Sequence, residues 1–87
     1  SDSEKNQEEN KPKEFQGKEY TVYEAKQRQR QMETAMRAQR EKVRALQKGK
    51  ADQDEILAHK MKYQGQLNEY ARFSKKWDLD KNESVFI

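Results

Sequence analysis

Cysteine is absent from the 87 residues, and the chain has only one histidine, one proline and three glycines. Without cysteine, disulfides and thiolate-metal sites are excluded. A Ser-His-Asp arrangement would depend on His59 alone, and a Cys-His pair is impossible. No apolar run approaches the roughly 20 residues of a membrane-spanning helix. We therefore expect a non-enzymatic chain with no cofactor, no metal site and no membrane segment, and a solvated or seam-edge His59.

The chain is also poor in apolar residues, which make up 31% against 40% charged residues. So few apolar groups cannot fill a thick core, but they are enough for a thin seam between helices. The net charge of +3 is unevenly placed, because residues 20–50 carry nine Lys or Arg and three Glu. A polyanion would be attracted to that half of the chain.

Residues 1–19 are polar and mixed in charge, and they are interrupted by Pro12 and Gly17. Phe15 is their one large apolar side chain. Such a segment buries too little surface to offset the entropy of ordering it. We therefore predict a disordered, acidic lead-in. Phe15 is then either solvated, which we favour, or a short docking residue.

A helix is predicted over residues 22–48. Thr21 and Glu24 have the spacing of a capping box at its start. No proline or glycine interrupts the following residues, which are mostly good helix formers. Gly49 is placed for the left-handed turn that often ends a helix, and Lys48 is favourable at that end.

A second helix is predicted over residues 53–77. Asp52 is its candidate cap, and Asp54 and Glu55 supply the negative charge favoured in a first turn. Capping explains these carboxylates better than a cation site, because the glycine and distal glutamate of a calcium loop are missing. Gly65 weakens the helix, and it either admits a close backbone or is merely tolerated.

Apolar residues recur at alternating steps of four and three in both helices, which is typical of paired helices. The predicted pairing seam consists of Met32, Met36, Val43, Leu46, Ile56, Tyr63, Leu67, Tyr70 and Trp77. Ala25, Gln29 and Gln39 complete the first stripe, and Leu57, Met61, Ala71 and Phe73 are expected to widen the second. Polar seam positions cost stability but can fix the register of the helices.

The two helices match in length and are joined by about four residues, which favours antiparallel neighbours. The predicted fold class is all-α: an antiparallel, coiled-coil-like two-helix hairpin over residues 20–78, with a short irregular tail over residues 79–87. Each stripe is covered on one side only, so self-association or docking onto another protein is expected. The apolar residues 85–87 are either a docking strap or the cut edge of a longer protein.

Basic residues flank the seam of the first helix. Arg30, Arg37 and Arg44 recur every seven residues and therefore share a face, and Arg40 lies beside them. These four arginines are the candidate phosphate contacts. An ordinary solvated flank is the simpler interpretation, and base stacking is unsupported because aromatic residues do not alternate with the basic ones.

Three stretches resemble a known family: residues 20–25 (YTVYEA), residues 29–33 (QRQME) with Arg37 and Arg40 after them, and residues 70–75 (YARFSK). They are similar to the C-terminal helical region of phage minor capsid proteins, the minor capsid protein 2 group of phages and prophages of Gram-positive bacteria. The likeness covers about residues 20–79. Its YTxYEA start is fairly specific, whereas the charged helical middle is not.

The resemblance implies a structural role in head assembly, with portal, capsid or scaffold proteins as partners and packaged DNA as a candidate partner. It implies a place in the virion, and in the bacterial host cytoplasm during assembly. It implies no catalysis. Where the family tends to have Gly-Leu after the last helix, this chain has Asp78-Leu79, so its helix end is expected to differ. The alternative function is a nucleic-acid-binding hairpin that uses the basic face of the first helix.

Overall fold

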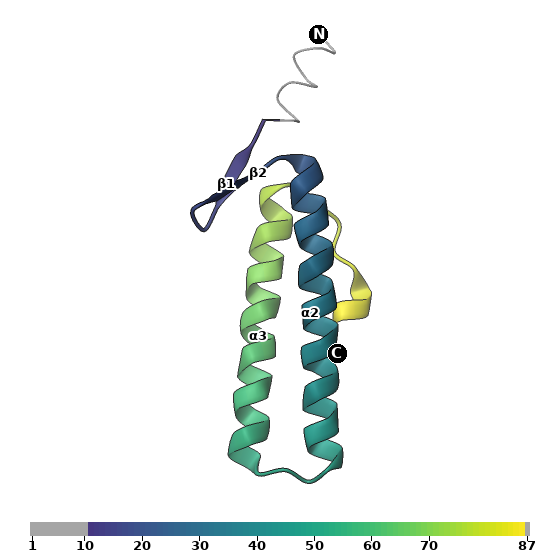
Figure 1. The fold of residues 1–87 in the computed structure, drawn as a ribbon. Coiled ribbons are helices and arrows are strands. Elements are labelled where there is room, and N and C mark those ends of the chain that lie inside the picture. Colours follow the sequence, from purple (N-terminus) through teal and green to yellow (C-terminus); the bar gives the residue numbers. More distant parts are fainter. Residues whose placement is uncertain (1–10, 87) are drawn as a thin grey trace.

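The computed structural model describes residues 11–86, in which two long helices stand side by side and run antiparallel (Figure 1). Helix α2 is Val22–Lys48 and helix α3 is Gln53–Lys76. Two short strands, β1 (Lys13–Phe15) and β2 (Lys18–Tyr20), precede them, and a 3-10 helix, η1 (Glu83–Val85), follows them. The predicted helical hairpin is confirmed, and the strand pair is an addition to it.

Side chains cap the start of both helices. The hydroxyl of Thr21 accepts from the Glu24 amide at 3.2 Å, and the Glu24 carboxylate accepts from the Thr21 amide at 3.0 Å. These hydrogen bonds lower the pKa of the Glu24 carboxyl, the backbone amide of Thr21 having the largest effect. Asp52 caps α3 by accepting from the Asp54 amide at 3.1 Å. Both caps are local devices that satisfy otherwise unpaired amides.

The prediction that a left-handed Gly49 ends helix α2 is wrong. Gly49 has a φ of −79°, and Lys50 takes the left-handed conformation with a φ of 56°. The amides of Lys50 and Ala51 donate to the carbonyls of Gln47 and Leu46, at 3.2 and 3.0 Å. This is the Schellman pattern, in which the left-handed residue is the one after the cap.

Helix α3 ends in the same pattern, one residue earlier than predicted, with Trp77 as its cap. Asp78 has a φ of 52°, and its amide donates to Lys75 O at 3.2 Å. The Leu79 amide donates to Ser74 O at 2.8 Å. The aspartate thus adopts the left-handed backbone conformation that glycine favours, and the expectation that this helix end differs from that of the phage family stays a prediction.

The strands form an antiparallel ribbon in which Glu14 pairs with Glu19. Gln16 and Gly17 make the turn, and both have positive φ, at 52° and 81°, as in a type I′ hairpin turn. The predicted disordered lead-in is thus wrong for residues 13–19. Lys11 and Pro12 lie outside the strands, and residues 1–10 of that prediction lie outside the described residues.

An aromatic cluster holds the ribbon against the hairpin. The ring centroids of Phe15 and Phe73 are 5.2 Å apart, and those of Tyr20 and Trp77 are 5.6 Å apart, both edge to face. Such pairs are worth roughly 0.5–1.5 kcal/mol each beyond the burial of their area. The prediction of a solvated Phe15 is wrong because this burial offsets the ordering of the short strands.

The core is concentrated at the ribbon end of the hairpin. Its main cluster consists of Ala25, Met32, Met36, Tyr63, Tyr70, Phe73, Trp77 and Val85. Toward the loop between the helices, Val43 and Ile56 are buried, whereas Leu46 is only half-buried. Leu57 and Met61 are 55% and 66% exposed, so they do not widen the apolar face as expected. The loop end is therefore the thinner half of the molecule.

Candidate functional site

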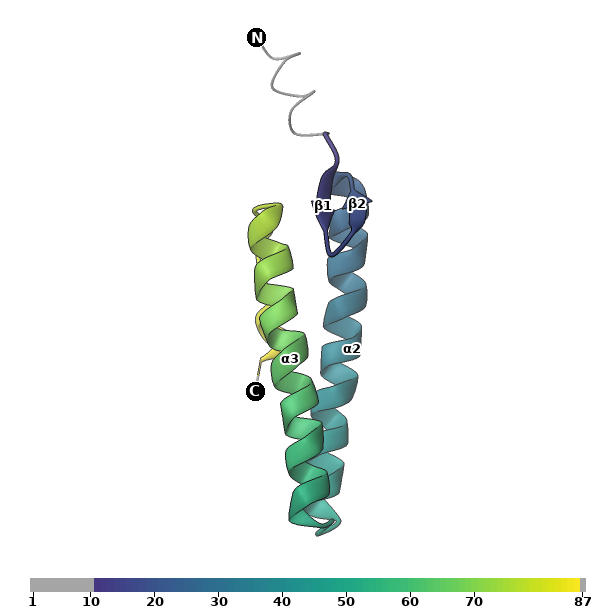
Figure 2. The ribbon, with the colours of Figure 1, turned by 90° about the vertical axis from the view of Figure 1, so that its left-hand side faces the viewer.

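Residues 79–86, here called the strap, leave the end of α3 and lie along the hairpin on a different side from the β-ribbon (Figures 1 and 2). Val85 is completely buried in the core, and Leu79 and Phe86 pack against it. The hydroxyl of Tyr63 donates to the carbonyl of Val85. Val85 and Phe86 thus dock onto the helices of their own chain, and Ile87 lies outside the described residues.

Gln29 links both helices to the start of the strap. Its side-chain amide nitrogen donates to the Ser74 hydroxyl on α3 and to the Asp80 carbonyl in the strap, each at 3.0 Å. An amide group carries two N–H donors, so one glutamine can make both bonds at once. Gln29 is buried at a polar position of the seam, and its bonds fix the register of the helices and the path of the strap.

Tyr70 makes a second link of this kind. Its hydroxyl donates to the buried carboxylate of Glu33 on α2 at 2.7 Å and accepts from the Asn82 amide in the strap at 2.8 Å. Burial raises the pKa of Tyr70 to about 12, with the Glu33 carboxylate adding to the rise and the Asn82 amide opposing it. The protonated phenol is therefore the form that this site stabilises.

Two of the candidate phosphate-binding arginines hold the end of the strap. Arg40 donates to the carbonyl of Phe86 at 3.2 Å and also to the carbonyl of Ser84. Arg37 donates to the Ser84 hydroxyl at 3.1 Å. These guanidinium groups bind the main chain and a hydroxyl of the strap, so each already has a partner within the chain.

The other two arginines are not among the strap's hydrogen-bond donors, although Arg44 shares the Glu41 carboxylate with Arg40. Arg44 pairs with the exposed carboxylate of Glu41 at 2.8 Å, and Arg30 is exposed on α2. A phosphate backbone is best bound by several cations that are free to approach it together. Of the four arginines of the predicted phosphate face, Arg37 and Arg40 therefore bind the strap. Arg44 is in an ion pair, and Arg30 is exposed to solvent.

The remaining seam positions contribute packing. The side-chain nitrogen Nε2 of Gln39 lies 3.0 Å from Nδ1 of the half-buried His59. The same nitrogen donates to the His59 carbonyl at 3.0 Å. The buried members of the predicted seam are Met32, Met36, Val43, Ile56, Tyr63, Tyr70 and Trp77. Leu46 and Leu67 are half-buried. His59 thus occupies the seam edge and bonds across the helix pair.

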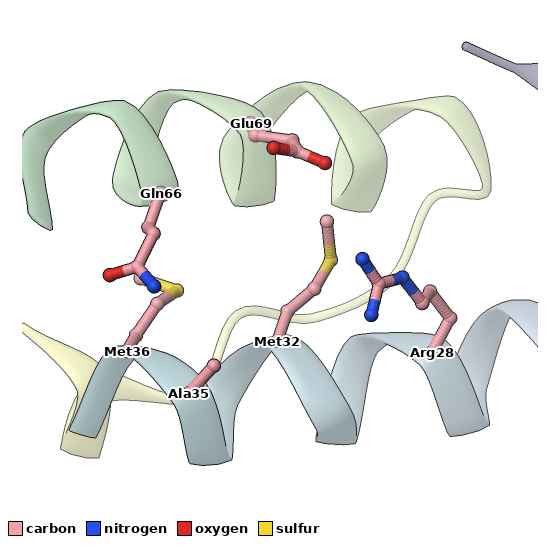
Figure 3. A pocket seen from close by; sticks show the side chains of 6 residues that line it. All are labelled: Arg28, Met32, Ala35, Met36, Gln66 and Glu69. Atoms are coloured by element: carbon pink, nitrogen blue, oxygen red, sulfur yellow. The ribbon is translucent and has the colours of Figure 1, made fainter. Parts of the chain in front are cut away.

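A small pocket opens between the helices beside this core (Figure 3). Its volume is about 160 Å³, and Met32, Ala35 and Met36 form its apolar part. Arg28 on α2 and Glu69 on α3 lie at its polar edge. Ligand pockets usually measure about 300–1,000 Å³, so this one has room for a single side chain of a partner rather than for a cofactor.

The sequence did not indicate the bonds of Gln29, Tyr70 and Arg40 to the strap. The apolar residues 85–87 were the one signal that could have indicated it. Across residues 11–86, no three His, Asp or Glu side chains gather as a metal-binding group. In the same part of the chain, neither long helix is apolar enough to cross a membrane. Comparison with protein-family models, with curated proteins and with solved structures finds no match to this chain.

Proposed function

We propose that this chain is a structural interaction module of a phage or prophage head protein, which contacts portal, capsid or scaffold proteins through its helical hairpin. It would act in the virion, and in the host cytoplasm during assembly. The observation that supports this most is where the stretches similar to minor capsid proteins lie. Residues 20–25 and 29–33 meet residues 70–75 at the ribbon end of the hairpin.

The contacts between those stretches are specific. The rings of Tyr20 and Phe73 meet edge to face at 5.4 Å, and Gln29 bonds to Ser74 at 3.0 Å. The Tyr70 hydroxyl bonds to the Glu33 carboxylate (from the QRQME stretch) at 2.7 Å. The residues that carry the resemblance are therefore used to join the helices. This supports a structural role in which these residues maintain the shape of the hairpin and its exposed surface contacts the partner.

Leu57 and Met61 are the first exposed surface to test. They are four residues apart on α3, so they lie on one face, and both are more than half exposed. A protein partner would gain from covering them, and the hairpin would keep its fold without them. Met61→Lys is the test variant, and Lys62→Met, next to it and also exposed, is the matched control.

Binding of the full chain to the purified portal, capsid and scaffold proteins of its own phage or prophage tests the proposal. Biolayer interferometry at about 50 mM and about 200 mM salt distinguishes protein binding from the alternative, nucleic-acid binding, because DNA affinity falls steeply over that range. We expect binding to one head protein that survives the higher salt and weakens in Met61→Lys. Absence of binding to all three would contradict the proposal.

Nucleic-acid binding remains the alternative, and the bonds of Arg37 and Arg40 to the strap count against it. A gel-shift titration with duplex DNA at the same two salt concentrations tests it. Arg30→Glu is the informative variant, because Arg30 is exposed and its replacement leaves the strap contacts intact. Lys62→Glu on α3 is the matched charge reversal. Retardation at low salt that Arg30→Glu alone weakens would favour the alternative.

A further inference from the structure

The groove beneath the strap recognises main chain more than side chains. Its bonds go to the carbonyls of Asp80, Ser84, Val85 and Phe86 and to the amide of Asn82. The strap contributes one polar side chain, the Ser84 hydroxyl, and one fully buried apolar anchor, Val85. Main-chain hydrogen bonds with a pocket for an anchoring side chain are the pattern of a peptide-binding groove.

The strap is joined to α3 by the turn at Asp78. Asp78 holds a left-handed φ of 52°, a conformation that glycine adopts freely and that other residues adopt at a cost. If Asp78 took ordinary helical or extended angles, that cost would be relieved and residues 79–86 would point away from their own groove. A change of the backbone angles at Asp78 would therefore open the strap, which makes this turn the candidate hinge.

We propose that the groove also binds the strap of a second copy of this chain, so that two hairpins exchange residues 79–86. The occupant is defined by the structure, because the groove already fits this segment in every contact described above. An exchanged dimer would keep all of these contacts and would change only the hinge and the connection between the chains. Exchange of an identical element is a low-cost route to a dimer, and strained hinge loops favour it.

Substitutions at the hinge test the proposal in the full chain. Asp78→Val opens the hinge, because a β-branched residue strongly disfavours positive φ. Asp78→Gly closes it, because glycine accepts that φ without strain. Sedimentation from micromolar to millimolar concentration should show a dimer whose dissociation constant is at least about tenfold lower in Asp78→Val and higher in Asp78→Gly than in the unaltered chain. The helical circular dichroism signal checks that each variant is folded.

Two further measurements identify the contact that forms the dimer. Val85→Asp, which removes the buried anchor, should abolish the Asp78→Val dimer. A mixture of ¹³C-labelled and unlabelled Asp78→Val chains should show nuclear Overhauser contacts between the Val85 methyls of one chain and the Tyr63 ring of another. A monomer at millimolar concentration in folded Asp78→Val would overturn the proposal. So would a dimer that survives Val85→Asp or that shows the contact within one chain only.

Discussion

The hydroxyl of Tyr70 donates to the Glu33 carboxylate at 2.7 Å and accepts from the Asn82 amide at 2.8 Å. One atom thus joins α2, α3 and the strap. Both Glu33 and Tyr70 are buried, so each depends on the other for a hydrogen-bond partner that water would otherwise supply. This junction holds the ribbon end of the hairpin in one arrangement.

Replacement of Tyr70 by phenylalanine should lower the free energy of unfolding by about 2–3 kcal/mol, because it leaves a buried carboxylate and a strap amide without this partner. Urea unfolding followed by circular dichroism measures the change. Tyr23→Phe is the control, because Tyr23 is 70% exposed, and its effect should stay within about 0.5 kcal/mol. Equal effects of the two variants would show that the junction contributes little.

Stability should fall at alkaline pH. Burial raises the pKa of Tyr70 from 10.0 to about 12, so between these values the folded chain keeps a proton that the unfolded chain releases. Unfolding is then favoured as pH rises, by at most about 1.4 kcal/mol per pH unit from this group. Urea midpoints between pH 9 and pH 12 in the unaltered chain and in Tyr70→Phe measure the contribution. The slopes should differ, and identical slopes would contradict the assignment.

Gly65→Ala should stabilise the chain by about 1 kcal/mol. Gly65 lies inside α3, and an added Cβ would meet nothing within 4 Å, so alanine brings its higher helix propensity without a clash. The close backbone approach that the sequence left open at this glycine is therefore absent. Gly49→Ala is the control, since its Cβ would lie 3.3 Å from the Ala45 carbonyl, and it should bring a smaller gain or none. Thermal unfolding ranks the two variants.

Val85→Ala should lower the free energy of unfolding by about 2 kcal/mol, because the side chain is completely buried in the core. Leu57→Ala removes a larger side chain that is 55% exposed, and its effect should stay within about 0.5 kcal/mol. Urea unfolding of both variants measures the difference. The reverse order would mean that the strap does not pack as described.

The bounds of α2 were predictable because Thr21, Glu24 and Gly49 mark its ends by local chemistry. The left-handed conformation of Lys50 was not predictable, since it depends on which amide reaches the Leu46 carbonyl. The cap of α3 at Asp52 was visible for the same local reason. The stripes also indicated which residues are buried, because helical periodicity places them on one face.

The ribbon was missed, and a docking strap was only one of two interpretations of residues 85–87, for a shared physical reason. Phe15 is ordered by Phe73, and Asn82 by Tyr70, and neither pair leaves a periodic pattern in the sequence. The Gln16-Gly17 turn is a weaker hairpin signal than Asn-Gly. Bonds to main-chain atoms, such as that of Arg40 to the Phe86 carbonyl, place no requirement on the residue type that accepts them.

Nuclear Overhauser spectra of the full chain in dilute solution test the central claim most directly, namely that two antiparallel helices are closed by the strap on one side and the ribbon at one end. We expect persistent contacts between the Val85 methyls and the Tyr63 ring, and between the rings of Tyr20 and Phe73. One continuous helix through Gly49, or a lack of contacts between these groups, would contradict the account.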